Sequence, residues 1–252
     1  MTRHPWISPD WPAPKLVRAL STTRNSGYSV APYASFNLSD YVGDAADAVA
    51  RNRTQLQEQA NLPSTPHWLR QVHGTRVLDL DISAGQTTPP PEADAVITTA
   101  RGVVCAIQTA DCLPLLLCDV AGTRVGAVHA GWRGLANGVI EAALTRLNIP
   151  AAQILAWLGP AIGAGAFEVG DDVRDAFVNA DPEASRCFRV HAPGKWHADL
   201  YELARMRLQR VGVTRVYGGE WCTFHDAQDF FSYRREGVTG RMATLIWLDP
   251  KV

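Results

Sequence analysis

The sequence predicts an α/β (α+β) fold, a single-domain layered sandwich in which outer helices cover a mixed, buried sheet. The chain has 252 residues, of which 46% are hydrophobic and 19% are charged, so it can bury one sizeable core. Several apolar runs are continuous rather than alternating, which is typical of strands buried on both faces. Segments with helical periodicity are interleaved with these runs, as in layered α/β proteins.

The predicted strands are short apolar segments separated by turn residues. The longest uncharged apolar run, Leu113 to Cys118, suits a buried strand better than a helix because it is so short. In chain order the predicted strands are Leu16–Thr22, Arg76–Leu80, Ala95–Thr99, Val103–Gln108, Leu113–Cys118, Arg124–His129, Ile154–Leu158, Phe230–Tyr233 and Met242–Leu248.

The predicted helices carry polar residues on one side and an apolar stripe on the other. The first reads ADAVARNRTQLQEQA, and the second lies between a glycine and a proline. No repeat or low-complexity linker divides the chain, so we expect one catalytic domain over residues 1–252, with residues 1–14 as an extended N-terminal segment. The four predicted helices are Ala46–Ala60, Leu135–Leu147, Asp171–Asn179 and Leu200–Val211.

Charge and composition narrow the possible partners. Lys+Arg number 24 and Asp+Glu 25, and this balance gives no electrostatic reason to expect nucleic acid or an anionic membrane as a partner. The first residues lack the apolar core of a signal peptide, and no apolar run approaches the roughly 18 residues of a membrane span. The five cysteines are odd in number and loosely spaced, which favours a reducing cytoplasm. We expect a monomer or a small homo-oligomer.

Three short motifs each place a potential metal ligand at the end of an apolar run: His73, Cys112 and His129. Two imidazoles and one thiolate match catalytic zinc sites, which use three protein ligands and leave the fourth position open. The alternative is a buried core cysteine with two turn histidines. Polar neighbours favour a site, because burying them without partners would cost about 1–3 kcal/mol each. The motifs are QVHG (Gln71–Gly74), TADCLPLLLCD (Thr109–Asp119) and AVHAGWRG (Ala127–Gly134).

These motifs belong to a longer ordered set that resembles the laccase-domain family, which is also labelled multicopper polyphenol oxidase and purine nucleoside phosphorylase. The resemblance runs from about residue 15 to residue 249. The further motifs are STTRNSGYS (Ser21–Ser29), SFNLSDYVGD (Ser35–Asp44), GPAIG (Gly159–Gly163) and FFSYRREGVTGR (Phe230–Arg241).

The resemblance implies a zinc enzyme with purine nucleosides and phosphate as substrates. Its metal ligands would be His73, Cys112 and His129. Members of the family phosphorolyse adenosine, inosine, guanosine and methylthioadenosine, and they also deaminate adenosine. The implied fold is a layered α/β domain like the cysteine-dependent catalytic domain of a bacterial toxin.

The histidine content bears on the laccase label. A multicopper oxidase needs a mononuclear site and a trinuclear cluster of about eight further histidines, usually in H-x-H pairs. This chain has seven histidines and no H-x-H pair. A true multicopper centre is therefore excluded, although Cu²⁺ could substitute for Zn²⁺ in the single site and oxidise phenols as a side activity.

Four further residues are candidates for catalysis or substrate binding. Asp111 is the candidate proton shuttle for deamination, or else a turn aspartate. Arg133, at the junction of a glycine-rich turn and a helix, and Arg24 are candidates to bind phosphate; Arg133 could equally be an exposed helix-start residue. Asn37 is a candidate to hydrogen-bond a ribose hydroxyl or a base edge, or else a turn residue.

Two other functions remain open. Cys112 as a nucleophile with His129 as its base would make a cysteine hydrolase or amidase, and some family members are tied to peptidoglycan editing, which would make the substrate a peptidoglycan precursor. The third possibility is a binding module that zinc merely stabilises.

Overall fold

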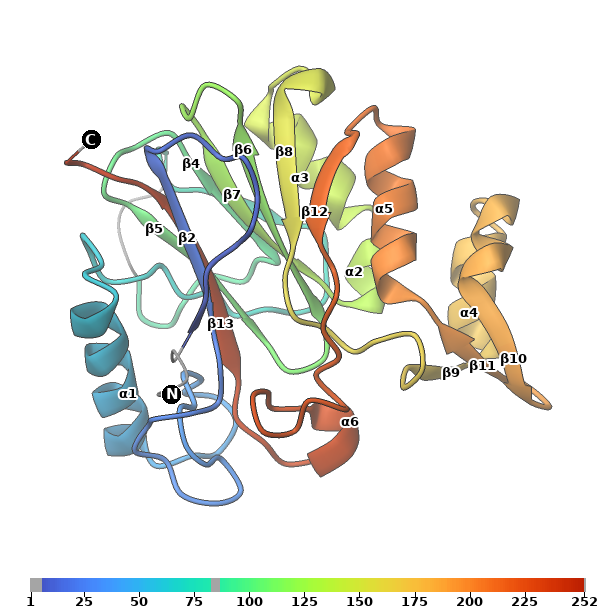
Figure 1. Ribbon diagram of the computed structural model, residues 1–252, viewed down its shortest axis with the longest axis horizontal. Helices are drawn as coiled ribbons and strands as arrows, with labels where there is room; N and C mark the ends of the chain where they lie inside the picture. Colours follow the sequence, from blue (N-terminus) through green and yellow to red (C-terminus); the bar gives the residue numbers. More distant parts are fainter. Residues whose placement is uncertain (1–5, 83–86, 252) are drawn as a thin grey trace.

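The computed structural model describes residues 6–82 and 87–251, and a six-stranded sheet forms the centre of the protein (Figure 1). Its strands are β3 (Val77–Asp79), β4 (Ala95–Thr98), β6 (Leu113–Asp119), β7 (Val125–Ala130), β8 (Ile154–Leu158) and β12 (Arg215–Gly218). They lie in the order β12-β8-β6-β7-β4-β3, with a parallel pair at each edge and antiparallel pairs between. The predicted mixed sheet is confirmed.

Strand β6 is buried at every residue because both faces of the sheet are covered. Leu113, Leu115 and Leu117 point into the cluster that packs against the helices, whereas Leu116 and Cys118 point toward a second sheet. Adjacent strand residues face opposite sides, so a strand buried on both faces reads as a continuous apolar run.

The second sheet has four antiparallel strands in the order β1-β2-β13-β5. They are β1 (Trp6–Ile7), β2 (Val17–Thr22), β5 (Val104–Thr109) and β13 (Met242–Leu248). Residues from the middle of β5 and β13 pack directly onto the six-stranded sheet, so a shared apolar layer joins the two sheets. Strand β1 lies within the predicted extended segment 1–14, of which residues 1–5 are outside the described part.

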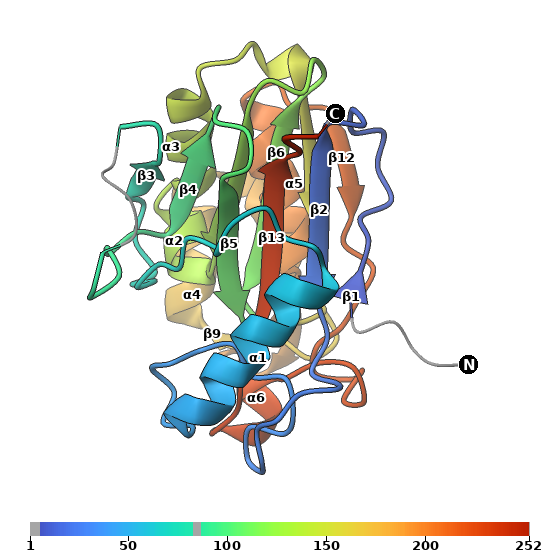
Figure 2. The same cartoon turned by 90° about the vertical axis from the view of Figure 1, so that its left-hand side faces the viewer.

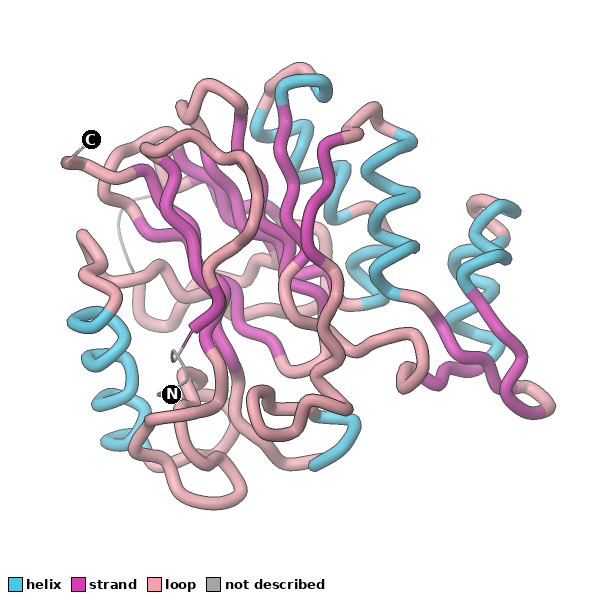
Figure 3. Tube along the Cα trace, viewed as in Figure 1, coloured by secondary structure: helices cyan, strands magenta, loops and turns pink. Residues whose placement is uncertain are grey.

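Helices cover the two outer faces, so the layers run helix, sheet, sheet, helix (Figures 2 and 3). Helix α1 packs on the four-stranded sheet, and α3 and α5 pack on the six-stranded sheet. Among the described residues, no helix combines the length and apolar character needed to span a membrane. The covering helices are α1 (Ala46–Gln59), α2 (Trp132–Ala136), α3 (Val139–Leu147) and α5 (Leu200–Arg210).

A small antiparallel sheet and two more helices lie beside this sandwich. The small sheet has the order β10-β11-β9 and packs against α4, at the right of Figure 1. Helix α6 is a single turn below the sheets. The bounds are β9 (Glu168–Gly170), α4 (Asp171–Val178), β10 (Phe188–Ala192), β11 (Lys195–Ala198) and α6 (Tyr233–Glu236).

Most predicted elements are found within one residue of their expected bounds, but two predictions are wrong. Phe230–Tyr233 is not a strand: its two phenylalanines are buried in a loop, and Ser232 caps α6 by accepting a hydrogen bond from the Arg235 N–H. The predicted helix Leu135–Leu147 is two helices, because Gly138 has a left-handed φ of 93° between α2 and α3.

Because the two sheets depend on their shared apolar layer, Leu116→Ala should lower the free energy of unfolding by about 2–5 kcal/mol. Leu116 is fully buried there. Urea titration followed by circular dichroism measures the loss. The control is Val190→Ala, at a side chain that is 68% exposed, which should change stability by less than about 0.5 kcal/mol. Equal effects of both substitutions would contradict this account of the core.

Candidate metal and active site

The three predicted ligands meet at one edge of the two packed sheets. Cys112 lies in the turn between β5 and β6, His129 lies near the end of β7, and His73 lies in the loop before β3. Their ligand atoms all lie within 4.8 Å of one another. The Cys112 Sγ and His73 Nε2 atoms are 3.7 Å apart, and the two imidazole rings are nearly perpendicular at 4.7 Å between centroids. We call these residues the His–Cys–His cluster.

The donors fit a tetrahedral transition-metal ion. With a metal–sulfur distance of about 2.3 Å and a metal–nitrogen distance of about 2.0 Å, tetrahedral geometry separates the two donors by about 3.5 Å. The observed 3.7 Å is close to this separation. Among the described residues no other group of histidine, cysteine and acidic side chains has such geometry.

A buried carboxylate, Asp94, holds both histidines. Its Oδ1 atom is 2.8 Å from His129 Nδ1, so that nitrogen carries the proton and Nε2 is left to ligate a metal. The same carboxylate accepts hydrogen bonds from the backbone N–H groups of His73 and Gly74, at 2.9 and 2.7 Å. Burial alone would raise the pKa of Asp94, but its hydrogen bonds from His129 and Gly74 keep it below the usual value.

The backbone at the cluster adopts conformations that side chains disfavour. His73 and Asp111 have φ angles of 60° and 89°, in the left-handed region. Gly131 is required by close approach: a Cβ atom there would lie 2.6 Å from the His73 ring and 3.1 Å from Cys112 Sγ. Such strain is concentrated at functional sites, where the surrounding structure enforces it.

The electrostatics favour a thiolate at Cys112. Burial alone would raise the pKa of its thiol, but the positive charge and hydrogen bonding of His129, aided by His73, lower it to about 6. Burial would likewise lower the pKa of His129, yet Cys112 and Asp94 raise it to about 9. The thiolate is the form that both metal ligation and nucleophilic attack require.

The cluster opens into a cavity of about 490 Å³, which we call the site cavity. A larger cavity of about 1060 Å³ lies between the end of α1 and the end of β13, and no cluster residue lines it. We place the chemistry in the smaller cavity, because the strained and charged groups are there. The site cavity is lined by Tyr41, Gln71, His73, Gln108, Thr109, Ala110, Asp111, Cys112, His129, Arg133, Ile162, Phe167, Tyr233, Arg234 and Arg241.

Asp111 and Arg133 both line the site cavity. The Asp111 carboxylate accepts hydrogen bonds from the Thr223 hydroxyl at 2.6 Å and from the Arg234 backbone N–H at 2.7 Å. Asp111 therefore ties the turn that carries Cys112 to helix α6.

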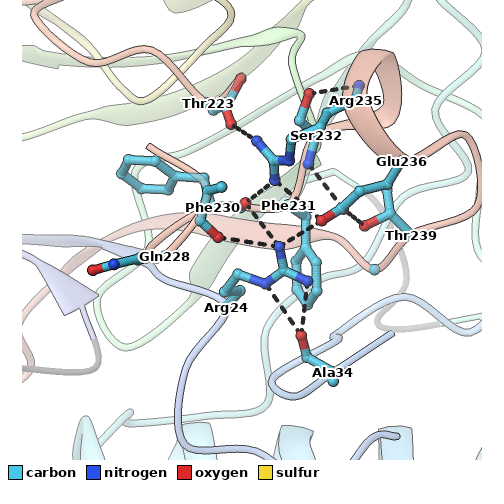
Figure 4. Close-up of polar contacts among 12 residues, drawn as sticks. Arg24, Ala34, Thr223, Gln228, Phe230, Phe231, Ser232, Arg235, Glu236 and Thr239 are labelled. Carbon is cyan, nitrogen blue, oxygen red and sulfur yellow. Dashed lines mark hydrogen bonds and ion pairs between the residues drawn. The ribbon is translucent and has the colours of Figure 1, made fainter. Parts of the chain in front are cut away.

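Arg24 does not line the site cavity. It forms a 2.6 Å ion pair with Glu236, donates to the carbonyl of Ala34 and lies 4.6 Å above the ring of Phe231 (Figure 4). Glu236 also accepts hydrogen bonds from Arg235 and Thr239, so this network anchors α6 from below. In this geometry Arg24 has a structural role, and its predicted contact with phosphate finds no support in the lining of the site cavity.

Asn37 is fully buried beneath the cavity wall. Its side chain donates to Asp44 and the Ser39 carbonyl, and its Oδ1 accepts from the backbone N–H of Arg241 at 2.9 Å. Asn37 thus positions a residue of the cavity instead of facing it.

Sequence reasoning missed four residues of this region: Asp94, Tyr41, Arg234 and Arg241. The last three lie inside motifs that had been recognised, and the only signal for Asp94 was an acid directly before the predicted Ala95 strand. Arg241 reaches the cavity because β13 pairs with β5 in the register Met242 to Thr109.

Fold and site together define a class of protein: a helix–sheet–sheet–helix sandwich with three potential metal ligands, the His–Cys–His cluster, where the strands of the two sheets end. A family model described as multi-copper polyphenol oxidoreductase laccase matches residues 18–249, and the chain belongs to this family. The family resemblance inferred from the sequence is confirmed.

Several relatives share nearly the whole chain. A Pseudomonas aeruginosa protein named purine nucleoside phosphorylase is 53% identical over 96% of this chain and 98% of its own. The Escherichia coli purine nucleoside phosphorylase YfiH is 51% identical over 96% of this chain and 98% of its own. The crystal structure of a Neisseria meningitidis protein, 51% identical, has a TM-score of 0.93 and covers 98% of this chain and 100% of its own. YlmD from Geobacillus stearothermophilus, 31% identical, has a TM-score of 0.89 and covers 99% and 98%.

Because Asp94 orients both histidines, Asp94→Asn should weaken metal binding about 10- to 100-fold while leaving all three ligands in place. Competition with a chromogenic chelator measures the dissociation constant for Zn²⁺. Asp119→Asn is the matched control, since Asp119 is also buried and accepts two backbone hydrogen bonds, from Thr123 and Arg124, at the far end of β6. A loss of the same size in the control would refute the orienting role.

The Glu236 network predicts a pH-dependent stability. Burial alone would raise the pKa of Glu236, but hydrogen bonds from Thr239 and Arg24 hold it below its ordinary value. Glu236→Gln should therefore cost on the order of 2 kcal/mol at pH 7. A carboxyl group whose pKa is lower in the folded state stabilises the fold at pH values above its unfolded-state pKa. The difference in unfolding free energy between wild type and Glu236→Gln should therefore shrink as pH falls through the folded-state pKa. Urea unfolding at pH 7 and pH 3 measures it.

The control for that prediction is Glu202→Gln. Glu202 forms an exposed ion pair with Arg186, which should contribute at most about 1 kcal/mol. A difference between wild type and Glu236→Gln that stays constant from pH 7 to pH 3 would contradict the charged role of Glu236.

Proposed function

We propose that this protein is a zinc-dependent purine nucleoside phosphorylase that accepts adenosine, inosine, guanosine and methylthioadenosine, and that it also deaminates adenosine. The observation that carries the proposal is the His–Cys–His cluster facing the site cavity, with a thiolate and one histidine fixed by Asp94. Relatives at about 50% identity over nearly their full length are named purine nucleoside phosphorylases, which supports it.

The cavity suits a nucleoside and an anion together. Its volume lies within the usual range of about 300–1,000 Å³ for small-molecule pockets. Tyr41 and Tyr233 on its wall are about half exposed, so their rings are available to stack on a purine. Guanidinium groups on the same wall are suited to phosphate.

In the proposed reactions, the His–Cys–His cluster and the wall of the site cavity have different roles. In phosphorolysis, a phosphate oxygen bonds to C1′ while the C1′–N9 bond breaks, and the purine leaves with the bonding pair and takes up a proton. In deamination, water adds at C6 of adenine and ammonia leaves. A zinc ion would be held by His73, Cys112 and His129 and would supply Lewis acidity. Asp111, beside Cys112, is the proposed proton-transfer group, since each of its oxygens keeps a lone pair.

Copper in place of zinc would give phenol oxidation as a side activity of this single site. One cluster and seven histidines do not suffice for the several coppers in the family's name. We further propose that the chain acts as one domain in the cytoplasm, as a monomer or small homo-oligomer.

A second candidate is a cysteine hydrolase acting on peptidoglycan precursors. The alignment of Asp94, His129 and Cys112 favours it, because a carboxylate-oriented imidazole beside a thiolate is the arrangement of thiol hydrolases. In that function the metal would block the nucleophile, so activity would rise when zinc is removed.

The test is incubation of the zinc-loaded protein with adenosine or inosine, with and without phosphate. Free purine and ribose 1-phosphate that appear only with phosphate, and inosine formed from adenosine, are the expected products by chromatography. Cys112→Ser should lose both zinc and turnover. Cys222→Ser, a cysteine outside the site cavity, should keep both.

Two outcomes would overturn the main proposal. One is full zinc occupancy without turnover of any purine nucleoside. The other is amide hydrolysis by the zinc-free protein that Cys112→Ser abolishes, which would establish the cysteine hydrolase instead.

A further inference from the structure

Three arginines gather on the wall of the site cavity: Arg133, Arg234 and Arg241. Arg133 lies in α2, whereas Arg234 in α6 and Arg241 just before β13 belong to one stretch of chain about a hundred residues later. The wall holds one carboxylate, that of Asp111, and both of its oxygens already accept hydrogen bonds from Thr223 and the Arg234 backbone. We call these three residues the arginine cluster.

The protein holds these side chains without neutralising them. Arg241 donates to the carbonyls of Thr239 and Gly240, at 2.9 and 3.0 Å, from one nitrogen of its guanidinium. Arg234 donates to the carbonyl of Glu168 at 2.8 Å.

Arg133 lies 4.4 Å from the ring of Trp132. Aromatic contacts hold the other two as well, because Arg234 lies over Phe167 and Arg241 over Tyr233, at 5.5 and 5.9 Å. Neutral partners fix the position of a guanidinium but leave its charge in place.

No residue of the arginine cluster has an acidic side chain within salt-bridge distance among residues 6–82 and 87–251. The nearby carboxylate of Glu168 is paired with His191 and Lys195, at 3.3 and 3.7 Å. The contrast with Arg24 is informative, since that structural arginine has Glu236 at 2.6 Å. Like charges on one cavity wall repel, and an anion in the cavity would relieve that repulsion.

The number of donors selects the kind of anion. Guanidinium groups match the oxygen atoms of phosphate and carboxylate through paired hydrogen bonds. A planar carboxylate offers about four acceptor sites in one plane, whereas a tetrahedral phosphate offers more acceptors in several directions and suits three guanidinium groups on one wall better.

We propose that Arg133, Arg234 and Arg241 form an oxyanion subsite, next to the His–Cys–His cluster, that binds orthophosphate and the phosphate group of the sugar-phosphate product. The proposal rests on the proposed function for its substrate, and it adds Arg234 and Arg241 as binding residues. Asn37 and the Arg24–Glu236 network then act as positioning residues, since they fix the backbone beside Arg241 and Arg234. Asp111 also holds the Arg234 backbone, in addition to its proposed role in proton transfer.

Direct binding of inorganic phosphate to the zinc-loaded protein tests the subsite without requiring turnover. Isothermal titration should give about tenfold weaker binding for Arg133→Gln, Arg234→Gln and Arg241→Gln, and a larger loss for the Arg133/Arg241 double variant. Sulfate, which shares the tetrahedral shape, should compete with phosphate, whereas acetate should compete far less. Arg51→Gln is the matched control: it removes the same charge from α1, where Arg51 lies over Tyr28 outside the cavity.

Steady-state kinetics separate the subsite from the proposed function. We expect the KM for phosphate to rise about tenfold in each cavity variant, with the KM for the nucleoside changed less than twofold and zinc content unchanged. If all three variants cleave nucleosides and keep the wild-type phosphate affinity and KM for phosphate, the subsite proposal is wrong and the proposed function stands. Phosphate binding that the variants weaken, in a protein that cleaves no nucleoside, would support the subsite and overturn the function.

Discussion

The carboxylate of Asp94 is completely shielded from solvent, yet it accepts hydrogen bonds from the ring of one histidine and from the backbone beside the other. A buried charge of this kind persists only where several donors surround it. Its donors belong to the loop of His73 and to strand β7, so the carboxylate joins these two segments. The hydrogen bonds that compensate the burial of Asp94 therefore also set the distance between the two histidines and the tautomer of His129.

The sandwich makes this arrangement possible by bringing two sheet edges together. Cys112 lies in the turn that leaves one sheet at β5 and enters the other at β6, so it belongs to both layers. Strand β13, the neighbour of β5, delivers Arg241 to the same edge. The apolar layer between the sheets, including Leu116 and Ile107, keeps these edges in register. Packing far from the cavity thus fixes the spacing inside it.

The sequence predicted what depends on local patterns and missed what depends on register. Apolar runs such as Leu113–Cys118 identified the buried strands, because burial on both faces leaves a direct trace in composition. The exposed hairpin β10–β11 left no such trace, and the aromatic pair Phe230 and Phe231 looked like a strand although loop packing buries them. The ligands were found through motifs, whereas Arg241 enters the site only through strand pairing.

Charge balance explains why the cavity needs two kinds of group. The Asp94 carboxylate and the Cys112 thiolate together carry two negative charges, equal and opposite to the charge of a divalent cation in the cluster. A divalent metal bound there would therefore be nearly neutralised by its own surroundings and would attract phosphate only weakly. The arginine cluster has no acidic partner in the described part of the chain, so we propose that the attraction for an anion comes from these three side chains. In the proposed function, a metal in the His–Cys–His cluster would then act on the uncharged substrate, the nucleoside, while the arginine cluster would bind the charged substrate, phosphate.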